Sequence, residues 1–228
     1  MPLPTEVLDA LVAPIRQCPV KIEWLDWNEN VTGEYTAYAI SGSVRFDASN
    51  EVRRSFTLIL ENSEGLFIPN GSLTNLGVKL RLKRGIVVNG VTYWWSRGVY
   101  VLTDPSCLNE GSRKEVTLNG VSKWALFNGD LGGVLTETYT IPSGTNVAQA
   151  IKAILQLKNE TKFNFENCTL ATPYTITKEP GNTLADLLRD LALIPSWELF
   201  DTIDGYWRFR PMVDASQKAV VIDLTIRG

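Results

Sequence analysis

The chain of 228 residues contains no histidine and only three cysteines. Without histidine it cannot form a Ser-His-Asp or Cys-His catalytic arrangement, a histidine-containing zinc site or the usual neutral-pH switch. Cys18, Cys107 and Cys168 lie too far apart for a CxxC metal site, and their odd number does not fit a disulfide framework. We therefore expect free thiols in a protein made in a reducing cytosol, with no bound metal and no cofactor.

Long apolar runs and an excess of positive charge are also missing. No stretch approaches the roughly 20 apolar residues that a membrane-spanning helix needs. Residues 1–17 contain Glu6 and Asp9 and lack a basic start, so we expect no signal peptide. The 22 Lys and Arg against 25 Asp and Glu give a net charge of −3. This balance argues against duplex DNA or an anionic membrane as the main partner.

Between residues 20 and 120 the apolar side chains recur with a period of two, which is typical of β-strands. Asn89-Gly90, between two β-branched runs, predicts a two-residue hairpin turn. The candidate strands are 20–24, 35–40, 55–61, 78–83, 86–88, 92–95, 99–102 and 116–118. Many short strands separated by turns predict an antiparallel barrel or sandwich.

After residue 128 the period changes to that of amphipathic helices. Asn146 with Gln149 predicts a capped helix, and Asn182 or Thr183 caps a second helix that Pro195 ends. In this second helix the spacing predicts a buried stripe, formed by Leu184, Leu187, Leu188 and Leu191. Each helix follows a strand-like Tyr-Thr-Ile and a glycine turn, which indicates a duplicated unit. Asp204-Gly205 predicts a further hairpin, between 197–201 and 206–210.

These patterns predict an α+β fold that is mainly β. An N-terminal arm (1–17) carries a short helix capped by Thr5, with Val7, Leu8, Leu11 and Val12 on one side. An antiparallel β-barrel or sandwich domain (18–127) is followed by a small α/β domain with two amphipathic helices (128–212). Residues 213–228 form a terminal strand, which could belong to a second, incomplete barrel.

Paired carboxylates are the only catalytic candidates. Asp186 and Asp190 are one helical turn apart, with Arg189 between them, which is typical of a solvated helix face. Asp201 and Asp204 lie around a turn, where aspartate is favoured for local hydrogen bonding. No phosphate-binding glycine loop or nucleophile elbow is present. We expect no catalytic residues and no enzymatic activity.

Aromatic and basic residues are the binding candidates. Trp94, Trp95, Trp197 and Trp207 could stack on a sugar, although core or interface packing is the usual role of strand tryptophans. A second group places positive charge on one strand: Lys79, Arg81, Lys83 and Arg84. We interpret that strand as a solvated sheet surface, which could also contact an acidic partner or passing nucleic acid without sequence specificity.

The order of several segments resembles tail-tip and baseplate hub proteins of tailed bacteriophages. The segments are Val20–Trp24, Arg54–Asn62, Glu64–Pro69, Val78–Gly85, Gly98–Leu102, Pro180–Ala192, Trp197–Phe200 and Asp204–Pro211. The resemblance implies a tube-type β-barrel followed by the α/β segment of a central tail hub. The chain is short for a complete hub, and it could be a fragment or a compact hub.

The resemblance implies a structural role in a virion. The expected component is made in the host cytoplasm and joins the tail tube to the tip by assembly with itself, as a ring with threefold symmetry, and with neighbouring tail proteins. A second resemblance leaves an alternative open. Tyr174-Thr-Ile-Thr with Gly181–Leu188 is similar to the first half of a LysM module, which implies binding of cell-wall glycan.

Overall fold

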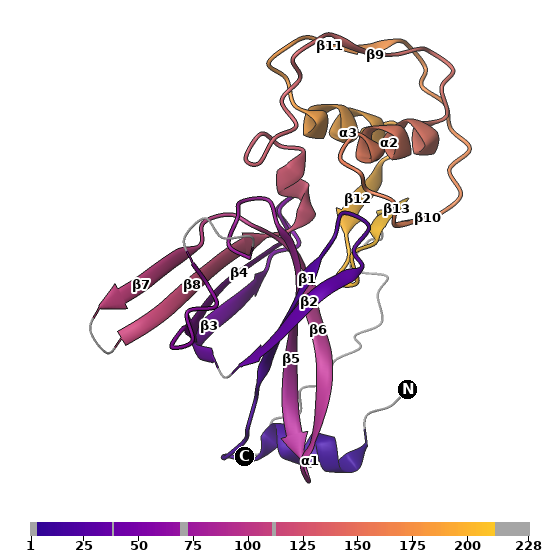
Figure 1. Ribbon diagram of the computed structural model, residues 1–228. Helices are drawn as coiled ribbons and strands as arrows, with labels where there is room; N and C mark the ends of the chain where they lie inside the picture. Colours follow the sequence, from indigo (N-terminus) through magenta and orange to yellow (C-terminus); the bar gives the residue numbers. More distant parts are fainter. Residues whose placement is uncertain (1–3, 38, 69–72, 111–112, 213–228) are drawn as a thin grey trace.

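The computed structural model describes residues 4–37, 39–68, 73–110 and 113–212. It contains a sheet region, residues 20–121, and an α/β region, residues 123–212, which sits on one end of the sheet (Figure 1). The terminal strand expected at 213–228 lies outside the described residues. The fold is α+β and mainly β, with antiparallel pairing in the sheet region, as the sequence predicts.

The sheet region is one strongly curled sheet of eight strands. The strands are β1 (Val20–Leu25), β2 (Val31–Ala37), β3 (Ala39–Phe46), β4 (Arg54–Glu61), β5 (Lys79–Val88), β6 (Val91–Leu102), β7 (Ser106–Glu110) and β8 (Arg113–Val121). The hydrogen-bonded order is β2-β1-β5-β6-β8-β4-β3, and β7 pairs with β8. Among the described residues no ladder joins β2 to β3, so the sheet is sandwich-like and does not close into a barrel.

The hairpin of β5 and β6 is longer than the sequence indicates. Asn89 and Gly90 have positive φ angles of 51° and 79°, which confirms the predicted turn. The segments expected as four short strands, 78–83, 86–88, 92–95 and 99–102, form two continuous strands. The register between them shifts at Leu82/Lys83, because Arg97 is an extra residue in β6 before Gly98, whose φ is 137°.

The first half of the sheet also differs from its expected boundaries. The predicted strand 35–40 covers parts of two strands. β2 begins before this range and β3 ends after it. The concave side encloses one core, built from Ile22, Trp24, Phe56, Leu58, Leu60, Phe67, Leu80, Leu82, Tyr100, Leu102, Val116 and Leu118. These side chains come mainly from alternate strand positions, which is why the period of two was visible in the sequence.

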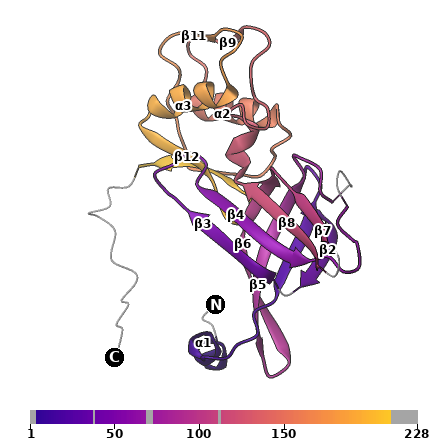
Figure 2. The same cartoon turned by 90° about the vertical axis from the view of Figure 1, so that its left-hand side faces the viewer.

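The N-terminal helix α1 (Thr5–Val12) lies at the far end of the β5–β6 hairpin (Figure 2). Pro4 occupies the cap position and Thr5 is already helical, so the expected cap by Thr5 is wrong. Val7 is fully buried, whereas Leu8, Leu11 and Val12 are exposed, although the sequence placed all four on one side. The helix therefore docks on β5 through a single apolar side chain.

The α/β region has two helices, a 3-10 turn and two small sheets. The elements are η1 (Lys123–Leu126), β9 (Tyr139–Ile141), α2 (Val147–Gln156), β10 (Phe163–Phe165), β11 (Ile176–Lys178), α3 (Leu184–Leu193), β12 (Trp197–Asp201) and β13 (Trp207–Pro211). The sheet β10-β13-β12 contains the predicted Asp204-Gly205 hairpin, and β9 pairs with β11. The predicted stripe of leucines on α3 is buried in one core with α2, Trp124 and Trp207.

The helix caps agree with the sequence. The Asn146 side chain accepts a hydrogen bond from the Gln149 amide at 3.1 Å. Thr183 forms a capping box with Asp186, so Thr183 and not Asn182 caps α3. These bonds satisfy N–H groups that the first helical turn leaves free.

The duplicated unit is present, and its two copies are related by an offset of 37 residues. The amide of Val147 donates to the Leu170 carbonyl at 3.0 Å, and the amide of Leu184 donates to the Gly133 carbonyl at 2.7 Å. Thr140 pairs with Thr177 at the centre of the β9–β11 ladder. The sequence suggested that Tyr139-Thr-Ile is equivalent to Tyr174-Thr-Ile. The structure shows that this alignment is out of register by two residues. Each copy completes the start of the other copy's helix.

Candidate assembly surfaces and the charged junction

The two regions meet at a cluster of buried charges, the charged junction, formed by Glu29, Lys79, Lys123 and Glu160. Lys123 is fully buried at the start of η1. Its Nζ donates to Glu29 Oε1 at 2.6 Å, to Glu160 Oε2 at 2.5 Å and to the Gly205 carbonyl at 2.6 Å. An ammonium group has three N–H donors, so each one has a partner.

Lys79 completes the charged junction from the sheet side. Its Nζ donates to Glu160 Oε1 at 2.6 Å and to the Trp27 carbonyl at 3.3 Å. The interpretation of Lys79 as part of a solvated basic face is therefore wrong, because its side chain is buried. A buried ammonium needs carboxylate partners, and Glu160 comes from a loop about 80 residues away that the strand pattern does not reveal.

Glu160 and Lys123 are held in their charged forms by their neighbours. Burial acts to raise the pKa of Glu160, but Lys123 and Lys79 outweigh it and hold that pKa below its ordinary value of 4.5. Burial likewise acts to lower the pKa of Lys123, and Glu160 and Glu29 outweigh it and raise that pKa. Two lysines and two glutamates make the junction electrically neutral, which reduces the cost of burying them.

Two backbone positions with positive φ angles, Glu29 itself and Gly205, allow the Glu29 side chain to reach its place in the junction. The φ of Glu29 is 62°, in the left-handed region, and Lys162 lies 3.3 Å from its Oε2. A side chain at Gly205, whose φ is 85°, would collide with this carboxylate. The glycine of the β12–β13 turn is thus required both by the turn and by the close approach of Glu29.

A second set of ion pairs fastens β12 to the end of β4. Arg54 pairs with Asp201, and both side chains are buried. Arg53 pairs with Glu198 Oε2 at 3.0 Å, and Arg210 with Glu198 Oε1 at 2.7 Å. Asp201 is therefore part of the contact between the regions, and no described interaction joins it to Asp204, its partner in the catalytic hypothesis.

The other candidate carboxylates also have structural partners. Asp186 accepts bonds from the Thr183 amide and hydroxyl at 2.8 Å each and pairs with Arg189 at 2.8 Å. The backbone bond to Thr183 is the main reason that the pKa of Asp186 is lowered. Asp190 pairs with Lys178 at 2.8 Å. Asp186 therefore stabilises the start of α3, and Asp190 belongs to a surface ion pair.

The candidate tryptophans are spread over the molecule. Trp207 is fully buried, and its Nε1 donates to Glu160 Oε2 at 2.9 Å. Trp197 packs on Phe209, and Lys21 lies over the ring of Trp94. Trp95 lines a small hollow beside α1. No two of these four rings are in contact within the described residues, so they do not make a shared sugar platform.

The remaining basic side chains of β5 divide into two groups. Arg81 and Lys83 pair with Glu23 on the neighbouring strand, at 3.0 and 2.5 Å. Arg84 is exposed, and in the described part of the chain it forms no ion pair. The predicted solvated face is therefore a local network around Glu23, with Arg84 outside it.

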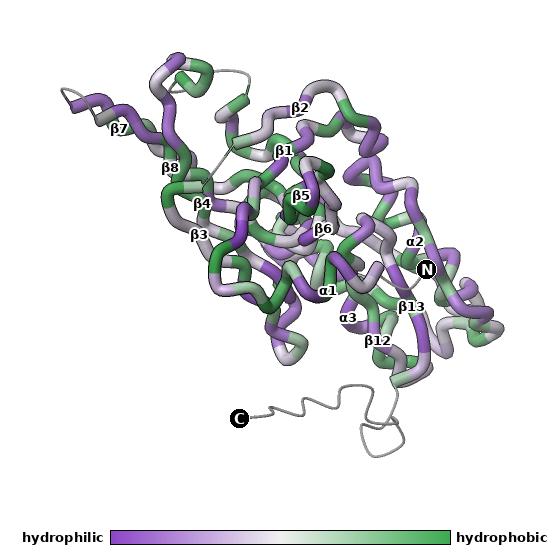
Figure 3. Tube along the Cα trace, turned by 90° about the horizontal axis from the view of Figure 1, so that it is seen from below, coloured by the Kyte–Doolittle hydropathy of each residue, from purple (hydrophilic) through white to green (hydrophobic). Residues whose placement is uncertain are grey.

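Strand edges without a partner are the clearest surfaces for assembly. β3 pairs only with β4, β7 only with β8, and β2 only with β1 in the described ranges. The β7–β8 hairpin projects away from the rest of the molecule as an arm, and its outer part is largely hydrophilic (Figures 1 and 3). Open edges can pair with another chain through backbone hydrogen bonds.

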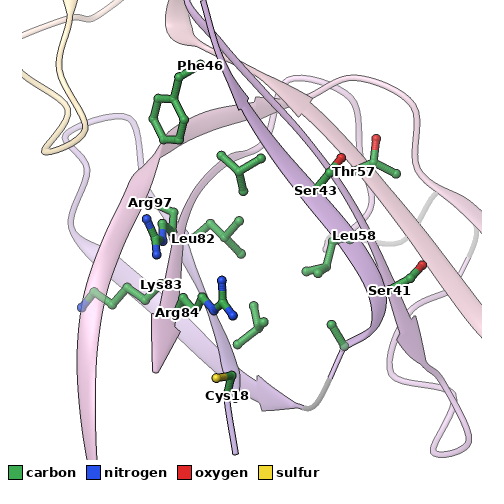
Figure 4. Close-up of a pocket in the computed structure, with 14 residues that line it drawn as sticks. Cys18, Ser41, Ser43, Phe46, Thr57, Leu58, Leu82, Lys83, Arg84 and Arg97 are labelled. Carbon is green, nitrogen blue, oxygen red and sulfur yellow. The ribbon is translucent and has the colours of Figure 1, made fainter. Parts of the chain in front are cut away.

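A cavity of about 380 Å³ lies between β3 on one side and β5 and β6 on the other (Figure 4). Its apolar lining comes from the sheet core and includes Val20, Val44, Leu58 and Leu82. Arg84 reaches toward the opening, whereas Lys83 extends away from it. We call this feature the β3 opening.

The described residues lack both the side-chain cluster of a metal site and the helix of a membrane span. They contain no cluster of three or more His, Cys, Asp or Glu side chains able to hold a metal ion. They also contain no helix long and apolar enough to span a bilayer. The three cysteines are free thiols.

The curled antiparallel sheet, followed by a duplicated strand–helix unit, is similar to the fold of two solved tail proteins. The 43 kDa tail protein of prophage MuSo2 from Shewanella oneidensis aligns over 86% of this chain with a TM-score of 0.56 and 12% identity. A tail protein from Neisseria meningitidis MC58 aligns over 89% with a TM-score of 0.58 and 14% identity. These alignments cover 56% and 53% of the two proteins, so the chain spans about half their length.

A similar fold occurs in a further solved complex. A chain of the Francisella PdpA-VgrG complex aligns over 93% of this protein and 31% of its own length, with a TM-score of 0.55 and 10% identity. The sequence matches no family model, and no curated protein matches it. The structural alignments bear out, at the level of the fold, the resemblance that the sequence indicated.

Proposed function

We propose that this protein is a structural, non-enzymatic component of a phage tail tip or baseplate hub, which joins the tail tube to the tip by subunit assembly. The observation that carries the proposal is the fold shared with two tail proteins over 86% and 89% of the chain. The protein is made in the host cytoplasm and is incorporated into the virion at the tail tip or baseplate.

Its partners are copies of itself and neighbouring tail proteins. The free edges of β2, β3 and β7 supply backbone donors and acceptors that set the register of a contact. Helix α1 supplies apolar surface, because Val12 is 83% exposed and Leu8 and Leu11 are also exposed. A closed ring, with threefold symmetry in our proposal, pairs such surfaces without leaving a free end.

The test measures the mass of the purified protein by light scattering after gel filtration and images it by negative-stain electron microscopy. We expect closed rings. The double variant Leu8→Asp with Val12→Asp should dissociate them and leave the thermal unfolding unchanged, because both side chains are exposed. Thr5→Asp adds a charge at a polar position of the same helix and should leave the ring intact.

A monodisperse monomer at high concentration, with no ring in the particle, would contradict the proposal. Zymogram clearing of peptidoglycan that disappears in Asp201→Asn would contradict its non-enzymatic part. The glycan-binding alternative has less support, because a LysM module needs a second helix after the segment that resembles its first half. In the described chain α3 is followed directly by the β12–β13 hairpin.

A further inference from the structure

Helix α1 carries an apolar stripe that its own chain leaves uncovered. Leu8, Leu11 and Val12 are 49%, 38% and 83% exposed. With 3.6 residues per turn they lie next to one another on the helix surface, beside the buried Val7. Of the three described α-helices, α1 alone exposes more than one large apolar side chain. An eight-residue helix is marginal by itself in water, so a contact along this stripe would stabilise it.

An acidic side chain without a partner flanks the stripe. Asp9 is exposed and forms no ion pair within the described residues. At 3.6 residues per turn it is about 60° around the helix from Val12, whereas Glu6 is about 120° away. A surface that receives the stripe therefore needs an apolar floor and a basic group on one border.

The β3 opening has this chemistry. Its lining is apolar, and its volume of about 380 Å³ has room for side chains of one helix stripe but not for a helix, which is about 10–12 Å across. Arg84 and Arg97 border it, and neither forms an ion pair within the described residues. Arg97 is the extra residue of the β6 bulge, and bulges redirect side chains. Figure 4 shows Arg84 reaching toward the opening.

The stripe and the opening are separate surfaces of the same chain. Helix α1 packs on β5, and none of the residues that line the β3 opening comes from α1. Leu11 borders a second hollow, beside Trp95, and Leu8 and Val12 line neither hollow. One copy can therefore offer its stripe to a neighbour while its own opening receives the stripe of another copy. Such a head-to-tail contact closes into a ring when the rotation between copies allows it.

We propose that α1 of one copy docks in the β3 opening of a neighbouring copy, with Leu8 and Val12 against the apolar lining and Asp9 beside Arg84 and Arg97. The inference rests on the self-association in the proposed function and identifies its contact. Burial of the stripe drives the docking, and the charge pair fixes its orientation.

Cys18 provides a natural reporter, because its partly exposed side chain lines the opening. Isotope-labelled and unlabelled Val12→Cys chains are mixed at low concentration, concentrated and treated with a short bis-maleimide. Mass spectrometry of the linked peptides should show position 12 joined to Cys18 in pairs of mixed labelling. Glu6→Cys, on the other side of the helix, is the matched control and should give at least tenfold less of this link.

A charge-reversal series tests the pairing by sedimentation velocity. Asp9→Arg should raise the dissociation constant of self-association at least tenfold, and adding Arg84→Asp or Arg97→Asp should reverse most of that loss. Glu6→Arg makes the same charge change on the same helix and should alter the constant less than threefold. Asp9 and Glu6 are exposed, so both single variants should unfold at the wild-type temperature. Equal effects of the two would overturn the proposal.

The outcomes separate this contact from the proposed function. Rings that form without the link to Cys18 overturn the docking and leave the ring. Linked copies in dimers or open chains support the docking and contradict the closed ring. A link confined to peptides of like labelling places α1 on its own chain's opening and overturns the docking. A monomer in solution also overturns it, whereas the proposed function falls only if the particle lacks a ring as well.

Discussion

The sheet region and the α/β region satisfy their backbone groups in opposite ways. In the α/β region, the duplicated units close on each other, so that each helix start bonds to the other copy. In the sheet region, the two strands that end the hydrogen-bonded order, β2 and β3, do not pair with each other, which leaves edges open within the described residues. The comparison teaches that the α/β region satisfies its helix starts internally, whereas the described sheet region keeps unpaired strand edges on its surface.

The largest effect is expected in the α/β region. Leu188→Asp should lower the free energy of unfolding by about 4 kcal/mol or more, because it buries a charge without a partner in the core of α3. Urea unfolding measures this loss. Leu193→Asp is the control on the same helix, since Leu193 is 62% exposed, and should cost under about 0.5 kcal/mol. Wild-type stability of Leu188→Asp would mean that the helix is oriented differently.

The contact between the two regions is expected to come next. Lys123→Met should cost about 3–5 kcal/mol, because it leaves Glu29 and Glu160 buried without their shared partner. Hydrogen exchange should show the loss in both regions and not in one alone. Lys178→Met removes an exposed pair with Asp190 and should change stability by less than about 1 kcal/mol. If only the α/β region lost protection, the charged junction would not contribute to the stability of the sheet region.

Acid should act on the same junction. The pKa of Glu160 is lowered in the folded state, so its contribution to stability is full above its unfolded value near 4.5 and is lost as the pH falls through the folded value. Unfolding free energies measured from pH 7 to pH 3 should therefore decline below about 4.5. In Glu160→Gln this part of the decline should be absent, although the variant is less stable at neutral pH. An unchanged pH profile would exclude Glu160 as a contributor.

The smallest effect is expected at the two helix starts of the α/β region. Thr183→Ala and Asn146→Ala should each cost about 1 kcal/mol, because each removes an acceptor from a helix start. We expect Thr183→Ala to cost more, since it also breaks the capping box with Asp186. Thr177→Ala, at an exposed strand position, is the control. Thermal unfolding of the three variants provides the ranking.

Local signals predicted much of the fold. The turn at Asn89-Gly90, the cap at Asn146 and the leucine stripe of α3 depend on residues a few positions apart, and all are present. The burial of Lys79 could not be predicted this way, because its partner Glu160 is distant in sequence. The bulge at Arg97 depends on the positive φ of Gly98, and the sequence does not distinguish that glycine from an ordinary strand glycine.

The offset of 37 residues between the two strand–helix units has a consequence for how the chain reaches its native state. Each helix begins on a carbonyl that belongs to the other unit, so neither helix start can be completed while its counterpart is still a coil. The chain loses the entropy of closing the loop between the units before the two hydrogen bonds can form. A half-folded intermediate is therefore unfavourable. The α/β region should therefore fold and unfold as one step.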